Sequence, residues 1–270
     1  MSAFSGTVLN YAAFRPGIPE DVVRVLDGAV PSTSPRRLLD IGTGPGFVVK
    51  ALMPHFDDII ALDPEPDMLV AAEHLLRPVL PAQSRLLLQH GTAEDFTASP
   101  GWQADLVTIC RAFHWLDQAA VLSRLDQQVT PHGAVAVLSD HSLWTARTPW
   151  QQAIRALIQE FLGEQRRAGT AVFNPPSTPY EQVLAASAFS QVRTYRIPVV
   201  RAWVVATVLG YLASTSFAKP SLFGDRLPQF EQAATNLLTD YATDGVLIED
   251  NTFTVLIAHR PRCSGRRRPR

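Results

Sequence analysis

A cluster of glycines at residues 42, 44 and 46 is the segment of this sequence best suited to contact a ligand. It follows residues 36–41, an apolar run that predicts a strand, and precedes residues 46–53, whose composition suits a helix. Glycines at such a turn permit positive φ angles and let a ligand approach the backbone, while the following helix offers free N–H groups. We therefore expect a nucleotide-like group at Gly42, Thr43 and Gly44.

A carboxylate stands where such a ligand would need one. Residues 59–62 predict a second strand, which ends at Asp63. This is about the distance downstream at which an acidic residue receives the two hydroxyls of a ribose, and a carboxylate suits that contact because it accepts two hydrogen bonds. Asp63 is also suited to cap the predicted helix at residues 66–76, and the two roles are compatible.

The spacing of the glycines separates two classes of nucleotide ligand. A dinucleotide fingerprint would place its third glycine at position 47, where this sequence has Phe47. The glycines instead follow Asp40 at positions 42, 44 and 46, and this spacing resembles the first motif of class I S-adenosylmethionine (SAM)-dependent methyltransferases. The resemblance implies SAM as cofactor and S-adenosylhomocysteine (SAH) as its product.

The segment after the third predicted strand resembles the part of these methyltransferases that contacts the adenine ring. It comprises residues 91–96, and the resemblance implies cofactor contacts by Ala93, Glu94 and Asp95. Thr92 stands where many relatives carry an acidic residue, so Glu94, Asp95 and the backbone remain alternatives for the adenine contact.

Two further segments resemble the same family. Residues 109–117 look like the segment in which the fourth strand meets both SAM and the methyl acceptor. Residues 11–16 look like the N-terminal element that closes over SAM, and Arg15 is suited to pair with the SAM carboxylate because a guanidinium group is a planar fork. The other cofactor contacts that the resemblance implies are Tyr11, Met68 and Arg111.

His114, His141 and Asp140 are the candidate catalytic residues. A sulfonium methyl group is already activated, so the protein mainly aligns the acceptor for in-line displacement. A hydroxyl acceptor needs a base, and His114 follows the fourth strand beside the expected methyl position, whereas an amine must only arrive neutral. A structural role for His114 in its loop is the alternative, as are His141 and Asp140 just beyond the fifth strand. No metal-ligand spacing occurs, so we expect no metal.

Strand-like and helix-like segments alternate along the first part of the chain, which predicts a parallel, doubly wound α/β sheet. Two later strand-like segments, residues 191–199 and 251–260, flank a helix candidate at residues 229–241. Together these features predict a Rossmann-like, seven-stranded sheet with an antiparallel last strand and a helical lid inserted after the fifth strand.

This interpretation divides the chain into four parts. Residues 1–140 form the N-terminal element and SAM-binding core, residues 141–188 a helical lid, residues 189–260 the last two strands with cap helices, and residues 261–270 a disordered basic tail. A lid rich in Trp and Phe suits an enclosed small-molecule pocket. The resemblance suggests sugars or amino sugars of specialised metabolites as acceptors, and hence a role in natural product biosynthesis.

Composition limits the partners. A formal net charge of −1 gives no electrostatic reason to expect nucleic acid, and no run is apolar enough for a signal peptide or a membrane span. We expect a cytoplasmic protein with a small-molecule acceptor, while the oligomeric state stays open. The alternatives are a non-catalytic SAM-binding module, a nucleic-acid methyltransferase and a nicotinamide-dependent oxidoreductase.

Overall fold

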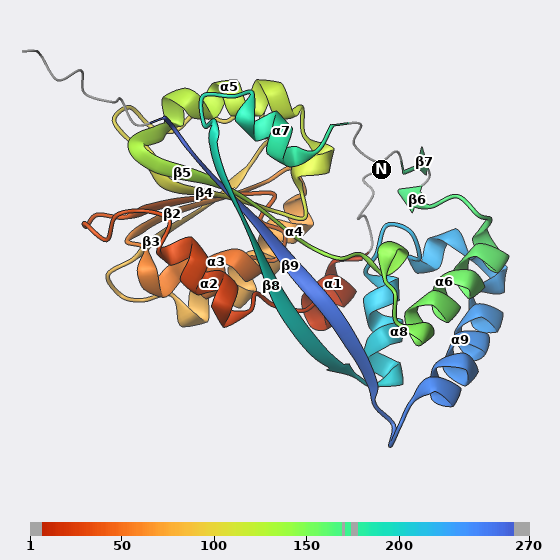
Figure 1. Cartoon of the computed structure of the whole chain (residues 1–270). Coiled ribbons are helices and arrows are strands. Elements are labelled where there is room, and N and C mark those ends of the chain that lie inside the picture. Colours follow the sequence, from red (N-terminus) through yellow and green to blue (C-terminus); the bar gives the residue numbers. More distant parts are fainter. Residues whose placement is uncertain (1–6, 169–170, 174–177, 262–270) are drawn as a thin grey trace, which may run out of the picture.

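The computed structural model describes residues 7–168, 171–173 and 178–261, and a seven-stranded sheet runs through it in the order β3-β2-β1-β4-β5-β9-β8 (Figure 1). Strands β1 to β5 are parallel, whereas β9 is antiparallel to both β5 and β8. The predicted Rossmann-like fold with an antiparallel last strand is therefore confirmed. The strands are β1 (Arg37–Ile41), β2 (Asp58–Asp63), β3 (Arg85–His90), β4 (Ala104–Cys110), β5 (Val129–Asp140), β8 (Gln191–Trp203) and β9 (Leu247–His259).

Helices cover both faces of this sheet. Consecutive residues Leu38 and Leu39 of β1 are both fully buried but belong to different apolar clusters, one on each face. That pattern is expected for parallel strands, which are buried on both sides. One cluster includes residues of α2 (Glu20–Asp27), α3 (Phe47–Leu52) and α4 (Pro66–Leu76), and the other includes residues of α5 (Gln118–Gln128) and α7 (Tyr180–Ala185).

A third apolar cluster joins three helices at one end of the molecule, which we call the cap. The cap consists of α6 (Pro149–Leu162), α8 (Val205–Ala213) and α9 (Leu227–Tyr241). Strands β8 and β9 extend past the other strands to reach it (Figure 1). Helix α1 (Val8–Phe14) packs against α8. This close approach depends on Gly210, since a Cβ atom there would overlap the ring of Phe14.

The segment between β5 and β8, which the sequence predicts as one lid, has two locations in the fold. Helix α6 belongs to the cap, while α7 lies against the sheet, where Leu184 is buried beside the residues of α5. Between them lies a hairpin of β6 (Arg167–Ala168) and β7 (Ala171–Val172). The short 3-10 helices are η1 (Met53–His55), η2 (Arg77–Val79), η3 (Phe113–Trp115), η4 (Leu143–Thr145), η5 (Pro220–Leu222) and η6 (Gly224–Arg226).

Strand β5 differs most from its prediction. The sequence predicts a turn at residues 131–133 and a strand only from residue 134, but β5 begins at Val129. Val129 pairs with Ala104, the next pair joins Ala134 with Leu106, and the register shift between them accommodates the extra residues as a bulge. Proline and glycine therefore mark an irregularity within the strand and not its start.

No helix among the described residues is long and apolar enough to cross a membrane. Nor does that part of the chain contain a group of three or more His, Cys, Asp or Glu residues placed to hold a metal ion. Apart from Pro261, the predicted basic tail lies outside the described residues.

Candidate active site

Two adjoining cavities lie where the carboxyl ends of β1, β2, β4 and β5 meet, the usual ligand position in a doubly wound sheet. The glycine-turn cavity has a volume of about 330 Å³ and is lined in part by Gly42, Gly44 and Asp63. The arginine cavity has a volume of about 230 Å³ and is lined in part by Arg15 and Arg166. Three residues line both cavities, namely Tyr11, Arg111 and Trp115.

The glycine turn is held close to both neighbouring strands. The N–H groups of Gly42 and Thr43 donate to the carbonyl oxygen of Leu62 in β2 over 2.8 and 3.0 Å. Gly42 has a φ of +66°, and a Cβ atom there would lie 2.6 Å from the Cβ atom of Ala112. Glycine is required at this position because both the backbone conformation and the available space exclude a side chain.

Asp63 connects the end of β2 to the glycine turn. Its carboxylate accepts hydrogen bonds from the N–H of Gly44 (2.8 Å) and from the N–H of Glu65 (2.9 Å). Burial raises its pKa from the ordinary value, although these two hydrogen bonds act in the opposite direction. Each carboxylate oxygen retains a lone pair, so a diol can still bind while the backbone fixes the carboxylate. The helix N-cap itself is Glu65.

Asp40 lies beneath the turn, where it accepts a hydrogen bond of 2.6 Å from the hydroxyl of Thr108. Burial raises the pKa of Asp40 to about 7. Its Oδ2 atom and the nearby hydroxyl oxygen of Thr43 are buried without a hydrogen-bond partner among the described residues. The Thr43 hydroxyl nevertheless interacts with this carboxylate and, like the Thr108 hydroxyl, opposes the rise in its pKa, so these two atoms are not evidence of a ligand. The fit for a cofactor comes from the turn above, where the glycine backbone and the Asp63 carboxylate line the glycine-turn cavity. The residues present therefore fit a cofactor such as SAM.

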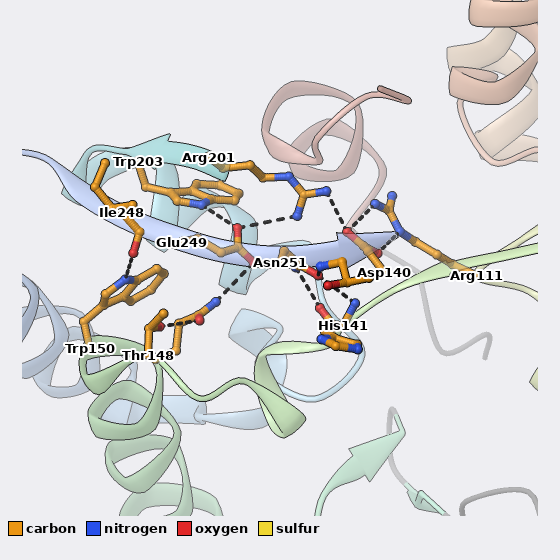
Figure 2. A network of polar contacts seen from close by, with 12 residues as sticks. Arg111, Asp140, His141, Thr148, Trp150, Arg201, Trp203, Ile248, Glu249 and Asn251 are labelled. Atoms are coloured by element: carbon orange, nitrogen blue, oxygen red, sulfur yellow. Dashed lines mark hydrogen bonds and ion pairs between the residues drawn. The ribbon is translucent and has the colours of Figure 1, made fainter. Parts of the chain in front are cut away.

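Arg111, which lines both cavities, pairs with Asp140 of the arginine cavity. Arg111 donates to Asp140 through Nε (2.6 Å) and through a terminal nitrogen (2.8 Å). Arg201 donates to the same carboxylate over 2.8 Å, and Figure 2 shows Asp140 between the two guanidinium groups. Burial alone would raise the pKa of Asp140, but the two arginines lower it far below its usual range. Asp140 therefore stays ionised and is a weak base at neutral pH.

The network continues from Arg201 into the cap (Figure 2). Glu249 of β9 lies 3.5 Å from Arg201 and accepts hydrogen bonds from the indole N–H of Trp203 (2.7 Å) and from the amide of Asn251 (2.7 Å). Asn251 also pairs with the backbone of His141 in both directions. These bonds join β5, β8 and β9 beside the arginine cavity, which Asp140 and His141 line.

His114 lies in η3, directly after β4, and lines the arginine cavity. Its ring is 4.8 Å from that of Trp115 and 5.8 Å from that of Phe173, measured between centroids. Burial, and secondly the charge of Arg166, lower its pKa to about 4. His114 is therefore neutral at physiological pH, able to accept or donate one hydrogen bond but weakly basic.

Most residues singled out in the sequence meet at these cavities. Tyr11, Gly42, Gly44, Asp63, Met68 and Arg111 line the glycine-turn cavity, and Arg15, His114, Asp140 and His141 line the arginine cavity. Thr43 is buried behind the turn.

The predicted adenine contacts lie apart from the lining of both cavities. Ala93 is buried in the core beside α5. The Glu94 carboxylate accepts from the N–H of Asp117 (2.8 Å), and the Asp95 carboxylate accepts from the Thr92 hydroxyl (2.8 Å). Both acidic side chains are thus hydrogen-bonded within the protein, Asp95 inside its own loop and Glu94 to the start of α5.

Sequence reasoning missed Arg166, Phe173 and Tyr180, all of which line the arginine cavity. Arg166 stands in a short polar stretch with no periodic pattern, and Tyr180 opens a helix that the sequence does not predict. The signal in the sequence for this part of the cavity was the aromatic content of the predicted lid, residues 141–188, which suited a small-molecule pocket.

Comparison with known proteins agrees with these features. Residues 39–137 match the family model described as a methyltransferase domain. An uncharacterized methyltransferase of Mycobacterium tuberculosis is 26% identical over 80% of this chain and 77% of its own length. A trans-aconitate 2-methyltransferase of Methylobacterium nodulans is 27% identical over 66% of this chain and 58% of its own.

A solved structure from Anaeromyxobacter dehalogenans, assigned as a type II methyltransferase, superposes with a TM-score of 0.58. It is 19% identical, and the alignment covers 92% of this chain and 98% of the other. At this identity the likeness concerns the fold alone.

Proposed function

We propose that this chain, which belongs to the class I SAM-dependent methyltransferases, binds SAM in the glycine-turn cavity and methylates a small molecule held in the arginine cavity. The observation that carries this proposal is the shared wall of the two cavities, formed by Tyr11, Arg111 and Trp115. A methyl donor in one cavity and an acceptor in the other would meet at that wall.

Residues of the glycine-turn cavity, together with Arg15 from the adjoining arginine cavity, would share the binding of SAM. Gly42 and Gly44 present backbone to the ligand, and Asp63 is placed to accept hydrogen bonds from the ribose hydroxyls. Arg15 is the candidate partner for the methionine carboxylate. When bound, SAM supplies an electrophilic methyl group on a sulfonium, so the protein's main contribution is alignment and exclusion of water.

The acceptor atom is an oxygen or a nitrogen. A hydroxyl would transfer its proton to His141 or His114, which both line the arginine cavity. His114 is a weak base for a histidine because burial lowers its pKa, and Asp140 is held ionised by two arginines. Sugars and amino sugars of specialised metabolites, with a role in natural product biosynthesis, stay a prediction from resemblance. The similarity to trans-aconitate 2-methyltransferases adds a small organic acid to the acceptors that should be tested.

The test combines ligand binding with methyl transfer. Calorimetry should detect binding of SAM and SAH, and methyl-labelled SAM should label one or more members of a panel of alcohols, amines and organic acids. Binding of NAD without SAM would contradict the proposal and favour an oxidoreductase. SAM binding with no transfer to any acceptor would favour a non-catalytic module, and labelling of tRNA or rRNA would favour a nucleic-acid methyltransferase.

A further inference from the structure

Two guanidinium groups face the arginine cavity without a carboxylate partner among the described residues. Arg15 donates from Nε to the Ser214 hydroxyl over 2.9 Å, and its charge lies over the ring of Tyr211 at 4.9 Å from the centroid. Arg166 lies over the ring of Phe173 at 4.0 Å, and its Nε atom is buried with no hydrogen-bond partner in the described chain. Neither arginine has a carboxylate within ion-pair distance in the part of the chain that the structure describes.

The other charges at this cavity are already balanced. Arg111 and Arg201 pair with Asp140 and Glu249, two positive charges with two negative ones. The undescribed segments at residues 169–170 and 174–177 contain no Asp or Glu in the sequence. Arg15 and Arg166 therefore leave the cavity with uncompensated positive charge.

We propose that the arginine cavity binds an acceptor that carries a carboxylate, and that Arg166 holds this group. This inference rests on the proposed function, because the methionine carboxylate of SAM is then the partner of Arg15. SAM carries two positive groups and one negative group, so its binding adds to the positive charge of the site. A planar guanidinium group matches a planar carboxylate, and a half-buried one interacts more strongly than one in water.

A carboxylate acceptor also agrees with the chemistry of the cavity. A carboxylate oxygen forms a bond to the methyl carbon, the carbon–sulfur bond breaks, and its electron pair goes to sulfur. The products are a methyl ester and SAH, and no proton is released, so no base is needed. His114, neutral because its pKa is lowered to about 4, can donate a hydrogen bond to the acid without having to act as a strong base.

The inference can be tested by comparing acids with their amides. Benzoate, succinate and tricarballylate would be titrated calorimetrically into the SAH complex, each alongside the corresponding amide. We expect acids to bind at least 10-fold more tightly than amides, and Arg166→Gln to weaken acid binding by about 10- to 100-fold while SAM affinity changes less than threefold. Arg166→Lys should restore part of the loss. Arg167→Gln, which removes the same charge from a neighbour outside the cavity lining, is the matched control.

Each outcome discriminates between the two proposals. Labelled methyl groups transferred to an acid should be released as methanol by alkali, as expected of a methyl ester. Acids that bind no better than amides, or an Arg166→Gln variant that loses SAM affinity to the same extent as acid affinity, would overturn the inference. Transfer only to neutral alcohols or amines would overturn it too and leave the proposed function standing. Failure to bind SAM would instead contradict the proposed function itself.

Discussion

The two cavities share a wall but are assembled in different ways. The glycine-turn cavity comes mostly from three short stretches, residues 42–44, 63–68 and 110–116, with Tyr11 added from α1. The arginine cavity combines α1, the residues after β4, the end of β5, the side chains of Arg166, Phe173 and Tyr180, and residues of α8 and just beyond it. The first therefore depends on local turn geometry, whereas the second depends on long-range packing between the cap and the sheet.

Because of this difference, the two cavities should tolerate substitution of their lining residues to different degrees. Strand ends and tight turns shape the glycine-turn cavity through backbone conformations that few residue types can adopt. Side chains from distant segments form the second, so replacing one of them alters acceptor specificity without rebuilding the fold. Arg111 belongs to both, and its φ of +56°, unusual for a residue with a side chain, places it at the junction.

The largest expected effect concerns the network beneath the arginine cavity. Asp140→Asn leaves Arg111 without its charge partner and Arg201 with Glu249 alone, and we expect the free energy of unfolding to fall by about 3–5 kcal/mol. Urea unfolding would measure it. Asp126→Asn is the matched control, because its pair with Arg260 lies at the surface and its loss should change stability by less than about 1 kcal/mol. Equal losses in both variants would show that the network is not a stability element.

The next effect concerns the glycine-turn cavity. Gly42→Ala introduces a side chain at positive φ and in contact with Ala112, so we expect stability to fall by roughly 2 kcal/mol and SAM binding to weaken strongly. Gly101→Ala shares the positive φ (+82°) but has nothing within 4 Å of the new atom. A similar cost in both variants would mean that contact with Ala112 contributes nothing.

A smaller effect is expected where α1 packs against α8 of the cap. Gly210→Ala raises helix propensity but drives a methyl group into Phe14, and we expect a net destabilisation of about 1 kcal/mol. Because Tyr11 and Arg15 are carried by α1 and its end, SAM affinity should fall as well. Gly17→Ala, with open space around the new atom, is the control for thermal unfolding and calorimetry. Unchanged SAM affinity in Gly210→Ala would show that the position of α1 does not influence SAM binding.

The smallest effect is the titration of His114. Its folded-state pKa of about 4 lies below the ordinary 6.5, so its contribution to stability is present above pH 6.5 and is lost as the pH falls toward 4. Arg166→Gln should raise this pKa slightly, since the arginine is the second cause after burial. Ring-proton chemical shifts followed by NMR would measure both. A His114 pKa that does not respond to Arg166→Gln would mean that the two side chains are electrostatically independent.

The contrast between local turn geometry in one cavity and long-range packing in the other explains what the sequence alone could predict. The doubly wound sheet with its antiparallel last strand and most of the glycine-turn cavity follow from consecutive motifs, because parallel strands bring their carboxyl ends to one edge. Arg166 and Tyr180 could not be placed, since their position depends on how the hairpin and α7 pack, and neither carries a periodic signal. Glu94 and Asp95 match the family by residue type, but Glu94 accepts from the N–H of Asp117, Asp95 accepts from the Thr92 hydroxyl, and neither lines the glycine-turn cavity.

The central claim is that the glycine-turn cavity binds SAM through the carboxylate at the end of β2. Calorimetric titration of SAM into the wild type, Asp63→Ala and Asp67→Ala tests it most directly, because Asp67 is an exposed acid on the same segment. We predict tight binding by the wild type and Asp67→Ala, and affinity lower by about 10- to 100-fold or more in Asp63→Ala, which loses charge-assisted hydrogen bonds. SAM binding by Asp63→Ala as tight as by the wild type would contradict the account.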